Sequence, residues 1–343
     1  MTLLRRLLLV VAVFCVCSCD RNRTPTWEKA DSPAVESQVT IEEATSPIAQ
    51  ASPAAEPKTN PGTSSEFRFI AYNVRNWLVM DRPANGQGTV RKSKPDDEKA
   101  AVISILSKHH PDVIGLCEIG TAEDLAEIQQ RLKDAGVELP HSHYTGGSDP
   151  VRHLGLLSKF PIVHTERPKE VDYKLHGKSF SLNRGILDAT VEARGRKYRF
   201  LGAHLKSKRE IEDADQEEMR QAEARLLRQH VDTILALDPQ ERLVVYGDFN
   251  DTRASPSVKI ITGNYGQADY LTPLPAEDRS GTSWTHFWNL HDVYARIDFI
   301  TVSKALKPEV DFKAARVLDD KEWEKASDHR PLMGVFRTKD PSR

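Results

Sequence analysis

The stretch YGDFND at residues 246–251 follows an apolar run and places a carboxylate, Asp248, two residues before a carboxamide, Asn250. Side chains two residues apart on a strand point to the same face, so both groups can act on one bound metal or water. The stretch SDHRP at residues 327–331 adds another carboxylate and an imidazole. Together these stretches indicate a metal-assisted phosphoesterase, whereas each alone is equally compatible with a surface turn or a helix cap.

Apolar segments with strand-like patterns alternate with segments of helical spacing along the chain. Strands are predicted at residues 67–74, 112–117, 154–157, 186–192, 198–204, 243–246, 295–301 and 332–336. Helices are predicted at residues 97–108, 211–237 and between a capping box of Thr121 with Asp124 and Gly136. Because hairpins and helical crossovers both join these strands, the pattern favours a mixed α/β arrangement over a purely parallel sheet.

Residues 1–19 have the pattern of an export signal, with a basic start followed by an apolar run at residues 7–16. This run is shorter than the about 20 residues that a membrane-spanning helix needs. The segment resembles a bacterial lipoprotein signal, in which Cys19 becomes the acylated N-terminus, although Cys17 departs from the usual small residue. We therefore expect an exported protein anchored in the bacterial cell envelope through a lipid on Cys19, with free secretion as the alternative.

Residues 20–65 are rich in Pro, Ser, Ala, Thr and Glu and predict a disordered tether. Residues 66–338 are long enough for one large α/β domain. Only Cys117 lies beyond the signal, so no internal disulfide is expected. The formal net charge of −2 excludes the global basic surface of a dedicated nucleic-acid binder, but it allows an enzyme that holds a phosphodiester briefly.

Polar residues recur where the predicted apolar strands end, within motifs such as AYN, LCE, GDFN and SDH. In chain order they are Asn73, Glu118, Arg184, His204, Asp248, Asn250, Asp298, Asp328 and His329. This ordered set resembles the endonuclease/exonuclease/phosphatase superfamily, which includes DNase I-like nucleases, abasic-site endonucleases, sphingomyelinases and inositol-polyphosphate 5-phosphatases. The resemblance covers residues 67–336 and implies a four-layer α/β/β/α sandwich of two mixed sheets flanked by helices.

The resemblance implies a divalent metal site. Glu118 and Asp328 match the carboxylates that bind the main cation, and Asn73 matches the asparagine that supports metal and phosphate. Carboxylate oxygens are hard donors that suit Mg²⁺ or Mn²⁺, so either ion is the expected cofactor. Taken singly, a glutamate at a strand end is commonly a salt-bridge residue, and an asparagine is commonly a turn former.

The resemblance also assigns catalytic roles. Asp248 and Asn250 match the pair that positions or deprotonates the attacking water. His329, oriented by Asp298, matches the histidine that contacts the scissile phosphate, and a neighbouring carboxylate raises an imidazole pKa and fixes its tautomer. His204 matches a second histidine that protonates the leaving oxygen, a step that typically contributes about 10²- to 10⁴-fold in rate.

Several cations accompany this set. Arg184 resembles the strand-borne arginine of the family that contacts phosphate, with a cross-strand ion pair as the alternative. Lys206 and Lys208 follow His204 and predict substrate binding, with a solvated basic turn as the alternative. Arg75 stands where abasic-site endonucleases carry an acidic metal ligand, which argues against a role in DNA repair.

The expected function is therefore an exported, divalent-metal-dependent phosphodiesterase that acts on nucleic acid, DNA or RNA, by water attack without a covalent intermediate. The alternatives are a phosphodiesterase for phospholipid head groups or a phosphomonoesterase of the same superfamily, and an inactive binding module. The aromatic residues Trp284, His286, Phe287 and Trp288 suit base stacking, a lipid head group or simple packing at a sheet edge. No protein partner is predicted.

Overall fold

The computed structural model describes residues 66–84, 88–169 and 171–338. The predicted signal, the tether and the predicted lipidation site Cys19 lie outside these residues. Within the described ranges, none of the helices is both long and apolar enough to cross a membrane.

Two six-stranded mixed sheets form the centre of the domain. The first contains β1 (Glu66–Trp77), β4 (Val113–Ile119), β5 (His141–Thr145), β6 (His153–Ser158), β17 (Arg316–Val317) and β18 (Leu332–Arg337). The second contains β7 (Ile162–Glu166), β10 (Ile186–Ala193), β11 (Arg196–His204), β12 (Leu243–Asp248), β13 (Thr272–Pro273) and β16 (Asp298–Val302). Their orders are β17-β18-β1-β4-β6-β5 and β13-β16-β12-β11-β10-β7, with parallel pairing of β1 with β4 and of β11 with β12.

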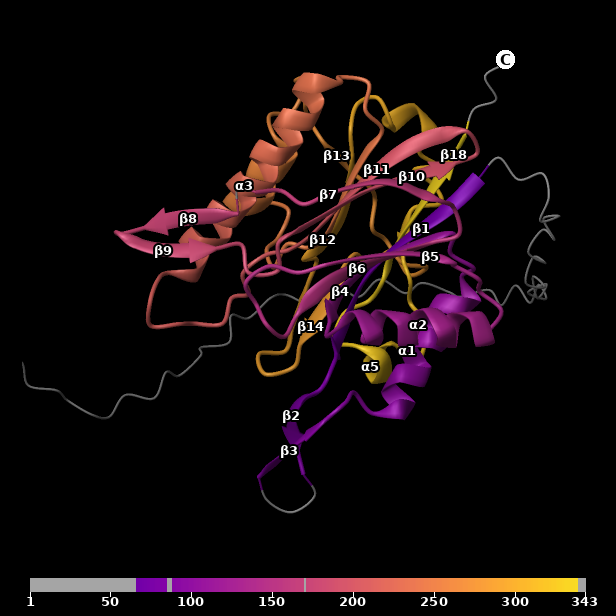
Figure 1. Ribbon diagram of the computed structural model, residues 1–343, viewed down its shortest axis with the longest axis vertical. Coiled ribbons are helices and arrows are strands. Elements are labelled where there is room, and N and C mark those ends of the chain that lie inside the picture. The colour runs from indigo at the N-terminus through magenta and orange to yellow at the C-terminus, as the bar shows by residue number, and fades with distance from the viewer. Residues whose placement is uncertain (1–65, 85–87, 170, 339–343) are drawn as a thin grey trace, which may run out of the picture. The chain divides into compact units, whose positions relative to one another are not determined.

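Helices cover the outer face of each sheet (Figure 1). The helices are α1 (Asp96–Lys108), α2 (Ala122–Asp134), α3 (Gln216–Leu237), α4 (Pro256–Thr262), α5 (Trp323–Ala326) and a 3-10 helix, η1 (Lys307–Glu309). Apolar residues of α1, α2 and α5 share one hydrophobic core with the first sheet, and those of α3 and α4 share another with the second sheet. A third core lies between the sheets. The predicted four-layer sandwich is therefore confirmed.

Three two-stranded hairpins lie outside the sheets. They are β2 (Met80–Pro83) with β3 (Thr89–Lys92), β8 (Asp172–Leu175) with β9 (Lys178–Ser181), and β14 (His286–Trp288) with β15 (Val293–Ala295). The hairpins β2–β3 and β14–β15 directly follow or precede strands that carry site residues, so they place exposed side chains close to the strand ends.

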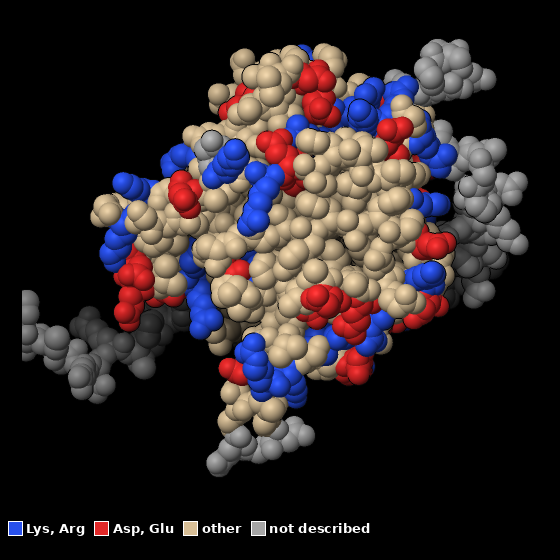
Figure 2. All heavy atoms as spheres, viewed as in Figure 1, with Lys and Arg blue, Asp and Glu red and all other residues tan. Residues whose placement is uncertain are grey.

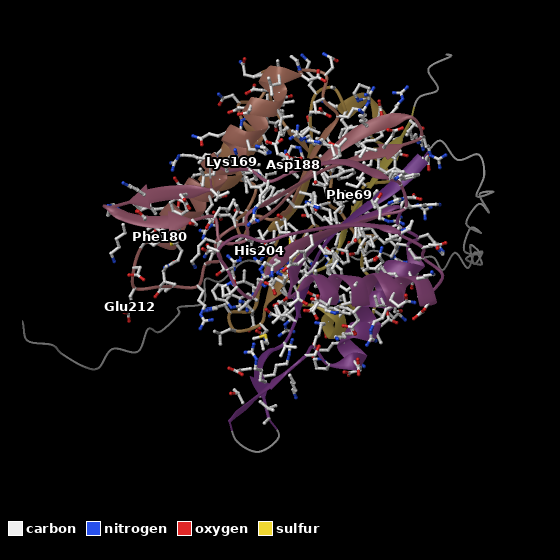
Figure 3. The ribbon with its side chains drawn as sticks, viewed as in Figure 1. Phe69, Lys169, Phe180, Asp188, His204 and Glu212 are labelled. Atoms are coloured by element: carbon white, nitrogen blue, oxygen red, sulfur yellow. The ribbon has the colours of Figure 1, made fainter. Side chains whose placement is uncertain are left out.

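Aromatic rings fill the layer between the two sheets. Phe69 packs against Phe200 and Tyr246, with ring centroids 5.0 and 4.9 Å apart, and all three side chains are buried. A Cβ atom at Gly115 would lie 2.1 Å from the Tyr246 ring, and one at Gly202 would lie 2.7 Å from its hydroxyl. The two glycines therefore make room for the Tyr246 ring, which packs between the two sheets two residues before Asp248. Figure 3 shows Phe69 in this layer and His204 nearer the strand ends.

The predicted capping box of α2 is confirmed. Thr121 Oγ1 accepts a hydrogen bond from the Asp124 amide, and Asp124 Oδ2 accepts one from the Thr121 amide at 2.8 Å. Gly136 follows the helix with a φ of 84°, in the left-handed region that favours glycine. Local sequence chemistry was therefore sufficient to define both ends of this helix.

The predicted start of the long helix at residue 211 is wrong. The helix α3 begins at Gln216, because Asp215 caps it by accepting a hydrogen bond from the Glu218 amide. Ile211 is 39% exposed and lies in the preceding loop, so its apolar side chain extended the helical pattern without taking part in the helix.

The single strand predicted at residues 295–301 is also wrong. The chain leaves β15 at Ala295 and enters β16 at Asp298, and the hydroxyl of Thr285 accepts hydrogen bonds from the amides of Ile297 and Asp298, both at 3.1 Å. A side chain from another segment thus takes the place of a strand partner. The break orients Asp298 at the start of β16.

Candidate active site

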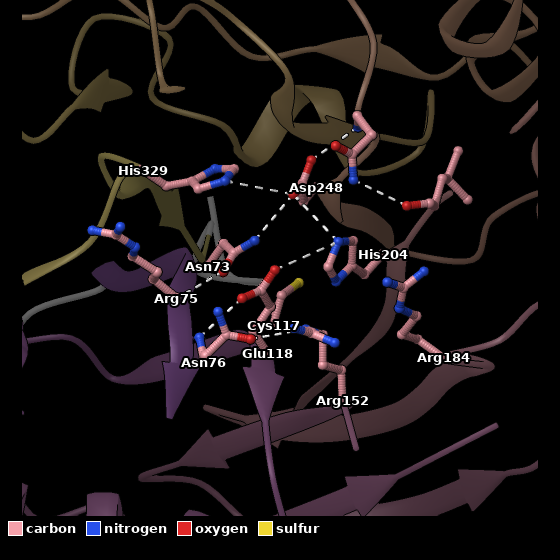
Figure 4. A network of polar contacts seen from close by, with 12 residues as sticks. Asn73, Arg75, Asn76, Cys117, Glu118, Arg152, Arg184, His204, Asp248 and His329 are labelled. Carbon is pink, nitrogen blue, oxygen red and sulfur yellow. Dashed lines mark hydrogen bonds and ion pairs between the residues drawn. The ribbon is translucent and has the colours of Figure 1, made fainter. Parts of the chain in front are cut away.

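The predicted site residues meet at one edge of the sandwich. Asn73, Glu118, His204 and Asp248 lie at or near the C-terminal ends of β1, β4, β11 and β12. Because β11 and β12 are parallel, His204 and Asp248 are direct register partners. Asp298 begins β16, which is antiparallel to β12, and it pairs with Asp248 from the other side. Strand pairing therefore brings His204, Asp248 and Asp298 together within the second sheet. The packing of the first sheet against the second brings Asn73 to Asp248 and Glu118 to His204 (Figure 4).

Left-handed backbone conformations occur at several of these strand ends. Glu118, Asn250, Arg75 and Asn76 have φ values of 64°, 51°, 47° and 55°. Non-glycine residues in such conformations cost about 1–3 kcal/mol each and gather at functional sites, where the surrounding structure enforces them. At Glu118 the turn brings the carboxylate to the Asn76 amide, which donates a hydrogen bond to Oε2 at 2.9 Å.

Asp248 is the centre of the polar network. Its Oδ2 accepts a hydrogen bond from Asn73 Nδ2 at 3.0 Å, and its Oδ1 accepts one from the Asn250 amide at 2.9 Å. The Nε2 atoms of His204 and His329 lie 3.5 and 3.7 Å from Oδ2. Burial raises the pKa of Asp248 to about 7, and the charge of His329 opposes that rise. This carboxylate is therefore able to accept a proton from water near neutral pH.

His329 is oriented by Asp298, as the sequence predicted. Its Nδ1 donates a hydrogen bond to Asp298 Oδ2 at 2.8 Å. Burial favours the neutral ring, but Asp298 and Asp248 together raise the pKa of His329 to about 10. Both ring nitrogens therefore carry a proton, and Nε2 presents a cationic donor to an anionic oxygen.

His204 has the opposite character. Burial, together with the charges of Arg184, His329 and Arg152, lowers the pKa of His204 well below its ordinary value. Its Nδ1 is buried and has no hydrogen-bond partner among the described residues. The ring is therefore neutral in the free protein, and an anion bound beside it would raise its pKa.

The carboxylates fit a divalent cation. Donor atoms of Asp248, Asp298 and His329 lie within 4.8 Å of one another. Asp328 contacts Arg75 Nε at 3.6 Å and His329 Nε2 at 4.0 Å, and its side chain remains partly exposed. His329 is protonated and hydrogen-bonded to Asp298, so its imidazole is not a suitable ligand. By the family resemblance, the oxygen donors of Glu118, Asp328 and Asn73 would hold the metal. Such a donor set suits Mg²⁺ or Mn²⁺.

Two further predicted residues lie beside this centre. Arg184 Nε lies 3.5 Å from Asp149 Oδ2, so its ion pair is with a loop carboxylate rather than with a neighbouring strand. Asn250 Nδ2 donates a hydrogen bond to the Leu205 carbonyl at 3.0 Å. The side-chain amide of Asn250 therefore holds the end of β11, while its backbone amide holds Asp248.

The two predicted substrate-binding lysines have partners within the protein. Lys206 is buried, and its Nζ donates to the carbonyls of Ser207 and Arg209 at 3.1 and 2.9 Å. Lys208 Nζ forms an ion pair with Asp251 Oδ1 at 3.3 Å. Both ammonium groups thus stabilise the loop that follows His204.

Residues that sequence reasoning missed support the site from the loops. Arg152 Nε donates to Asn76 Oδ1 at 2.8 Å, and Asn76 in turn holds Glu118. Ser327 Oγ donates to the Asn73 carbonyl at 2.8 Å. Asparagine is a common turn former, so the sequence offered a signal for Asn76, three residues after Asn73. Arg152 lies in a loop, and the sequence around it contains no comparable signal.

A buried glutamate beneath the site makes stability depend on pH. Glu223 of α3 accepts a hydrogen bond from the Lys206 amide at 2.6 Å, and burial raises its pKa from 4.5 to about 7. Between these values the folded protein binds more protons than the unfolded chain, so stability falls as pH rises through this window. Glu223→Gln should therefore raise stability at pH 8 relative to pH 5 by up to about 3 kcal/mol.

Urea unfolding of the metal-free protein at pH 5 and pH 8 measures this difference. Glu217→Gln, on the exposed side of the same helix, serves as the control and should keep the pH dependence of the wild type. If Glu223→Gln also retained the wild-type pH dependence, the raised pKa of Glu223 would be disproved.

Sequence comparison places this geometry in a family. The sequence model of the Endonuclease/Exonuclease/phosphatase family matches residues 84–329. The chain belongs to this family. The match includes Glu118, His204, Asp248 and His329, whereas Asn73 lies before it. Members of the endonuclease/exonuclease/phosphatase family hydrolyse phosphoester bonds and use divalent metals.

Similar solved structures confirm the fold. The chain is similar to the human Nocturnin catalytic domain with a TM-score of 0.56 and 19% identity, covering 80% of this chain and 95% of that chain. It is similar to beta toxin from Staphylococcus aureus with a TM-score of 0.55 and 15% identity, covering 78% and 99%. For humanized D. rerio TDP2 the values are 0.53 and 18%, covering 80% and 99%. No curated protein matches the sequence.

Proposed function

We propose that the protein is an exported, divalent-metal-dependent phosphodiesterase that cleaves nucleic acid, DNA or RNA. The observation that carries the proposal is the contact of one buried carboxylate, Asp248, with Asn73 and two histidines of opposite charge state. Such an arrangement provides a proton acceptor, a cationic donor and a neutral imidazole around one reacting centre. An inactive binding module has no need for a buried carboxylate with a raised pKa.

The residues divide the reaction among them. Asp248, with a pKa of about 7, accepts a proton from the attacking water. His329, held by Asp298, donates a hydrogen bond to the phosphate oxygens as negative charge develops there. His204, once its pKa is raised by the bound anion, protonates the leaving oxygen. A bound divalent cation supplies polarisation of the phosphate and stabilises its negative charge.

Exposed basic residues support nucleic acid as the substrate. Figure 2 shows Lys and Arg side chains gathered over the β2–β3 hairpin, where Arg91 and Lys92 are exposed. Arg82 joins this hairpin to the site, because its Nη2 donates to the Asn76 carbonyl at 2.7 Å. Arg75 is half-exposed beside Asp328. These cations can contact phosphates that flank the cleaved bond.

Export and lipid anchoring are part of the proposal. The basic start, the short apolar run and Cys19 support them from the sequence alone. A lipid on Cys19 would hold the enzyme at the cell envelope, where the substrate is extracellular or periplasmic nucleic acid. Mg²⁺, or Mn²⁺ in its place, is the proposed metal.

An exposed apolar hairpin favours phospholipid head groups as a second candidate substrate. On β14–β15 and its turn, Trp288 is 41% exposed and Leu290 is 78% exposed, and Tyr294 is exposed as well. The hairpin joins the site directly, since the Phe287 amide donates to the Asp328 carbonyl at 3.0 Å. Exposed apolar groups next to a phosphodiesterase site are suited to a membrane surface.

We expect the purified protein with Mg²⁺ to degrade plasmid and single-stranded DNA, and EDTA to stop the reaction. His204→Ala should lower the rate by about 10²- to 10⁴-fold, since it removes the group that protonates the leaving oxygen. The exposed His164 of β7 provides a matched control, and His164→Ala should keep the wild-type rate. Gel electrophoresis of the DNA at successive times measures the rate for the wild type, with and without EDTA, and for both variants.

Two results would contradict the proposal. Degradation that continues in EDTA and in His204→Ala would disprove the assigned chemistry. Intact DNA together with release of phosphocholine from vesicles of phosphatidylcholine or sphingomyelin would favour the second candidate.

A further inference from the structure

Two arginines from different loops flank His204 on one side. Arg152 precedes β6, and Arg184 precedes β10. A single carboxylate connects them, because Asp149 Oδ2 lies 3.5 Å from Arg184 Nε and Asp149 Oδ1 accepts a hydrogen bond from the Arg152 amide at 3.2 Å. The Asp149 amide donates to the Asn183 carbonyl at 2.9 Å, so the two loops are held together.

The guanidinium group of Arg184 has unused hydrogen-bonding capacity. Arg184 is 9% exposed, and its buried Nε finds no hydrogen-bond partner in the described part of the chain. Its one ion pair joins Nε to Asp149 Oδ2 at 3.5 Å, and no hydrogen bond of the two terminal guanidinium nitrogens is found among the described residues. An anionic oxygen from a ligand would satisfy these terminal donors. The arrangement is therefore built to receive an anion.

Arg152 lies on the same side of His204 as Arg184 (Figure 4). Its Nε donates to Asn76 Oδ1 at 2.8 Å, which fixes the plane of the guanidinium group beside the site. Figure 4 shows Arg152 and Arg184 next to His204, on the side away from His329. Asp149 pairs with the Arg184 guanidinium but meets Arg152 only at its backbone amide. The Arg152 guanidinium therefore has no carboxylate partner among the described residues and keeps its positive charge uncompensated on this side of the site. Both arginines also lower the pKa of His204.

We propose that Arg152 and Arg184 bind a second phosphate, which neighbours the scissile phosphate on the leaving-group side. The inference rests on the proposed nuclease function and specifies its substrate as a chain of consecutive phosphodiesters. His204 protonates the leaving oxygen, so the arginines beside it contact the part of the substrate that leaves. Guanidinium forks match phosphate oxygens with paired hydrogen bonds. A phospholipid head group with one phosphodiester has no second phosphate to offer.

Cleavage of three thymidine dinucleotides in Mg²⁺ tests the proposal. TpT has only the scissile phosphate, whereas pTpT and TpTp carry one more at either end. The products show which nucleoside leaves. We expect the additional phosphate on that nucleoside to raise kcat/KM about 10- to 100-fold over TpT, as charge-assisted hydrogen bonds do. In Arg152→Gln the ratio of kcat/KM with the additional phosphate to kcat/KM for TpT should fall to about 1.

Arg225→Gln, which removes one positive charge from the exposed side of α3, is the matched control and should keep the advantage. If Arg152→Gln does not fold, Arg152→Lys replaces it, since it keeps the charge, lacks the fork and should lose most of the advantage.

The outcomes separate the two claims. If the wild type cleaves all three dinucleotides but gains nothing from either terminal phosphate, or if Arg152→Gln keeps the gain, the second-phosphate site is disproved and the nuclease function stands. If the wild type cleaves neither dinucleotides nor DNA, both claims are overturned.

Discussion

Asp248→Asn should abolish turnover while leaving the metal-free protein at least as stable as the wild type. The substitution keeps the size of the side chain and one oxygen, which can accept the hydrogen bond from Asn73 or from the Asn250 amide but not both. It removes the only group in the proposed reaction that accepts a proton from water. We expect kcat to fall by about 10³- to 10⁴-fold, at the upper end of the contribution of a general base.

The expected stability follows from the sign of the pKa shift. Burial raises the pKa of Asp248 from 3.8 to about 7, so the folded state binds more protons than the unfolded chain between these values. Stability contributed by the protonated form is lost as pH rises through about 7. At pH 8 the wild type therefore holds a buried charge at a cost in free energy. A neutral carboxamide avoids this cost, which we expect to outweigh the loss of one hydrogen bond and of one of the three carboxylates near His329.

Asp251→Asn, three residues later, is the matched control with the opposite expectation. Asp251 pairs with Arg220 at 3.2 Å and with Lys208 at 3.3 Å, and although burial favours the neutral acid, these cations lower its pKa. Its removal should destabilise the protein by about 1–3 kcal/mol and retain most of the activity. Urea unfolding in EDTA and kcat in Mg²⁺ measure both quantities. Equal losses of activity in the two variants would refute the role of Asp248.

Strand periodicity made the centre of the site predictable. Asp248 and Glu118 each follow a buried apolar run, which placed both carboxylates near strand ends. The prediction that strand alternation points Asn250 the same way as Asp248 is wrong, because β12 ends at Asp248 and Asn250 has a φ of 51°. The structure adds which strands are neighbours. That β11 and β12 are parallel, and that β16 returns beside β12, determines that His204, Asp248 and Asp298 share one row of the sheet.

The periphery of the site could not be predicted, because long-range hydrogen bonds decide it. The sequence predicted that Lys206 binds substrate, but in the structure its Nζ donates hydrogen bonds to the carbonyls of Ser207 and Arg209. The break between β15 and β16 depends on the hydroxyl of Thr285, and no local sequence pattern predicts that contact. Single side chains that reach across segments leave no periodic trace in the sequence.

The two histidines differ in charge because their neighbours differ. Carboxylates surround His329 and raise its pKa to about 10, whereas burial and arginines keep His204 neutral. In the proposed reaction, His329 is thus the cation on one side of the phosphate, and His204 is the neutral ring on the other side. Without Asp298 this division should collapse, since the nearest anionic partner of His329 would be gone.

Asp298→Asn should therefore lower kcat by about 10²- to 10⁴-fold and move the alkaline limit of activity to lower pH. In the wild type, His329 stays cationic until pH approaches its pKa of about 10. The amide cannot stabilise that charge as the carboxylate does, so the cation is lost at a lower pH as pH rises. Asp292→Asn, in the exposed turn of β14–β15, should change neither quantity.

An NMR titration of the His329 ring in the metal-free variant separates the charge effect from any loss of metal. If the ring titrated as in the wild type while activity fell, Asp298 would act by position alone. A lowered pKa together with the earlier alkaline limit would show that the carboxylate sustains the cation, and that the reaction depends on that cation. The same carboxylate then both fixes Nδ1 through the 2.8 Å hydrogen bond and keeps Nε2 protonated toward the phosphate.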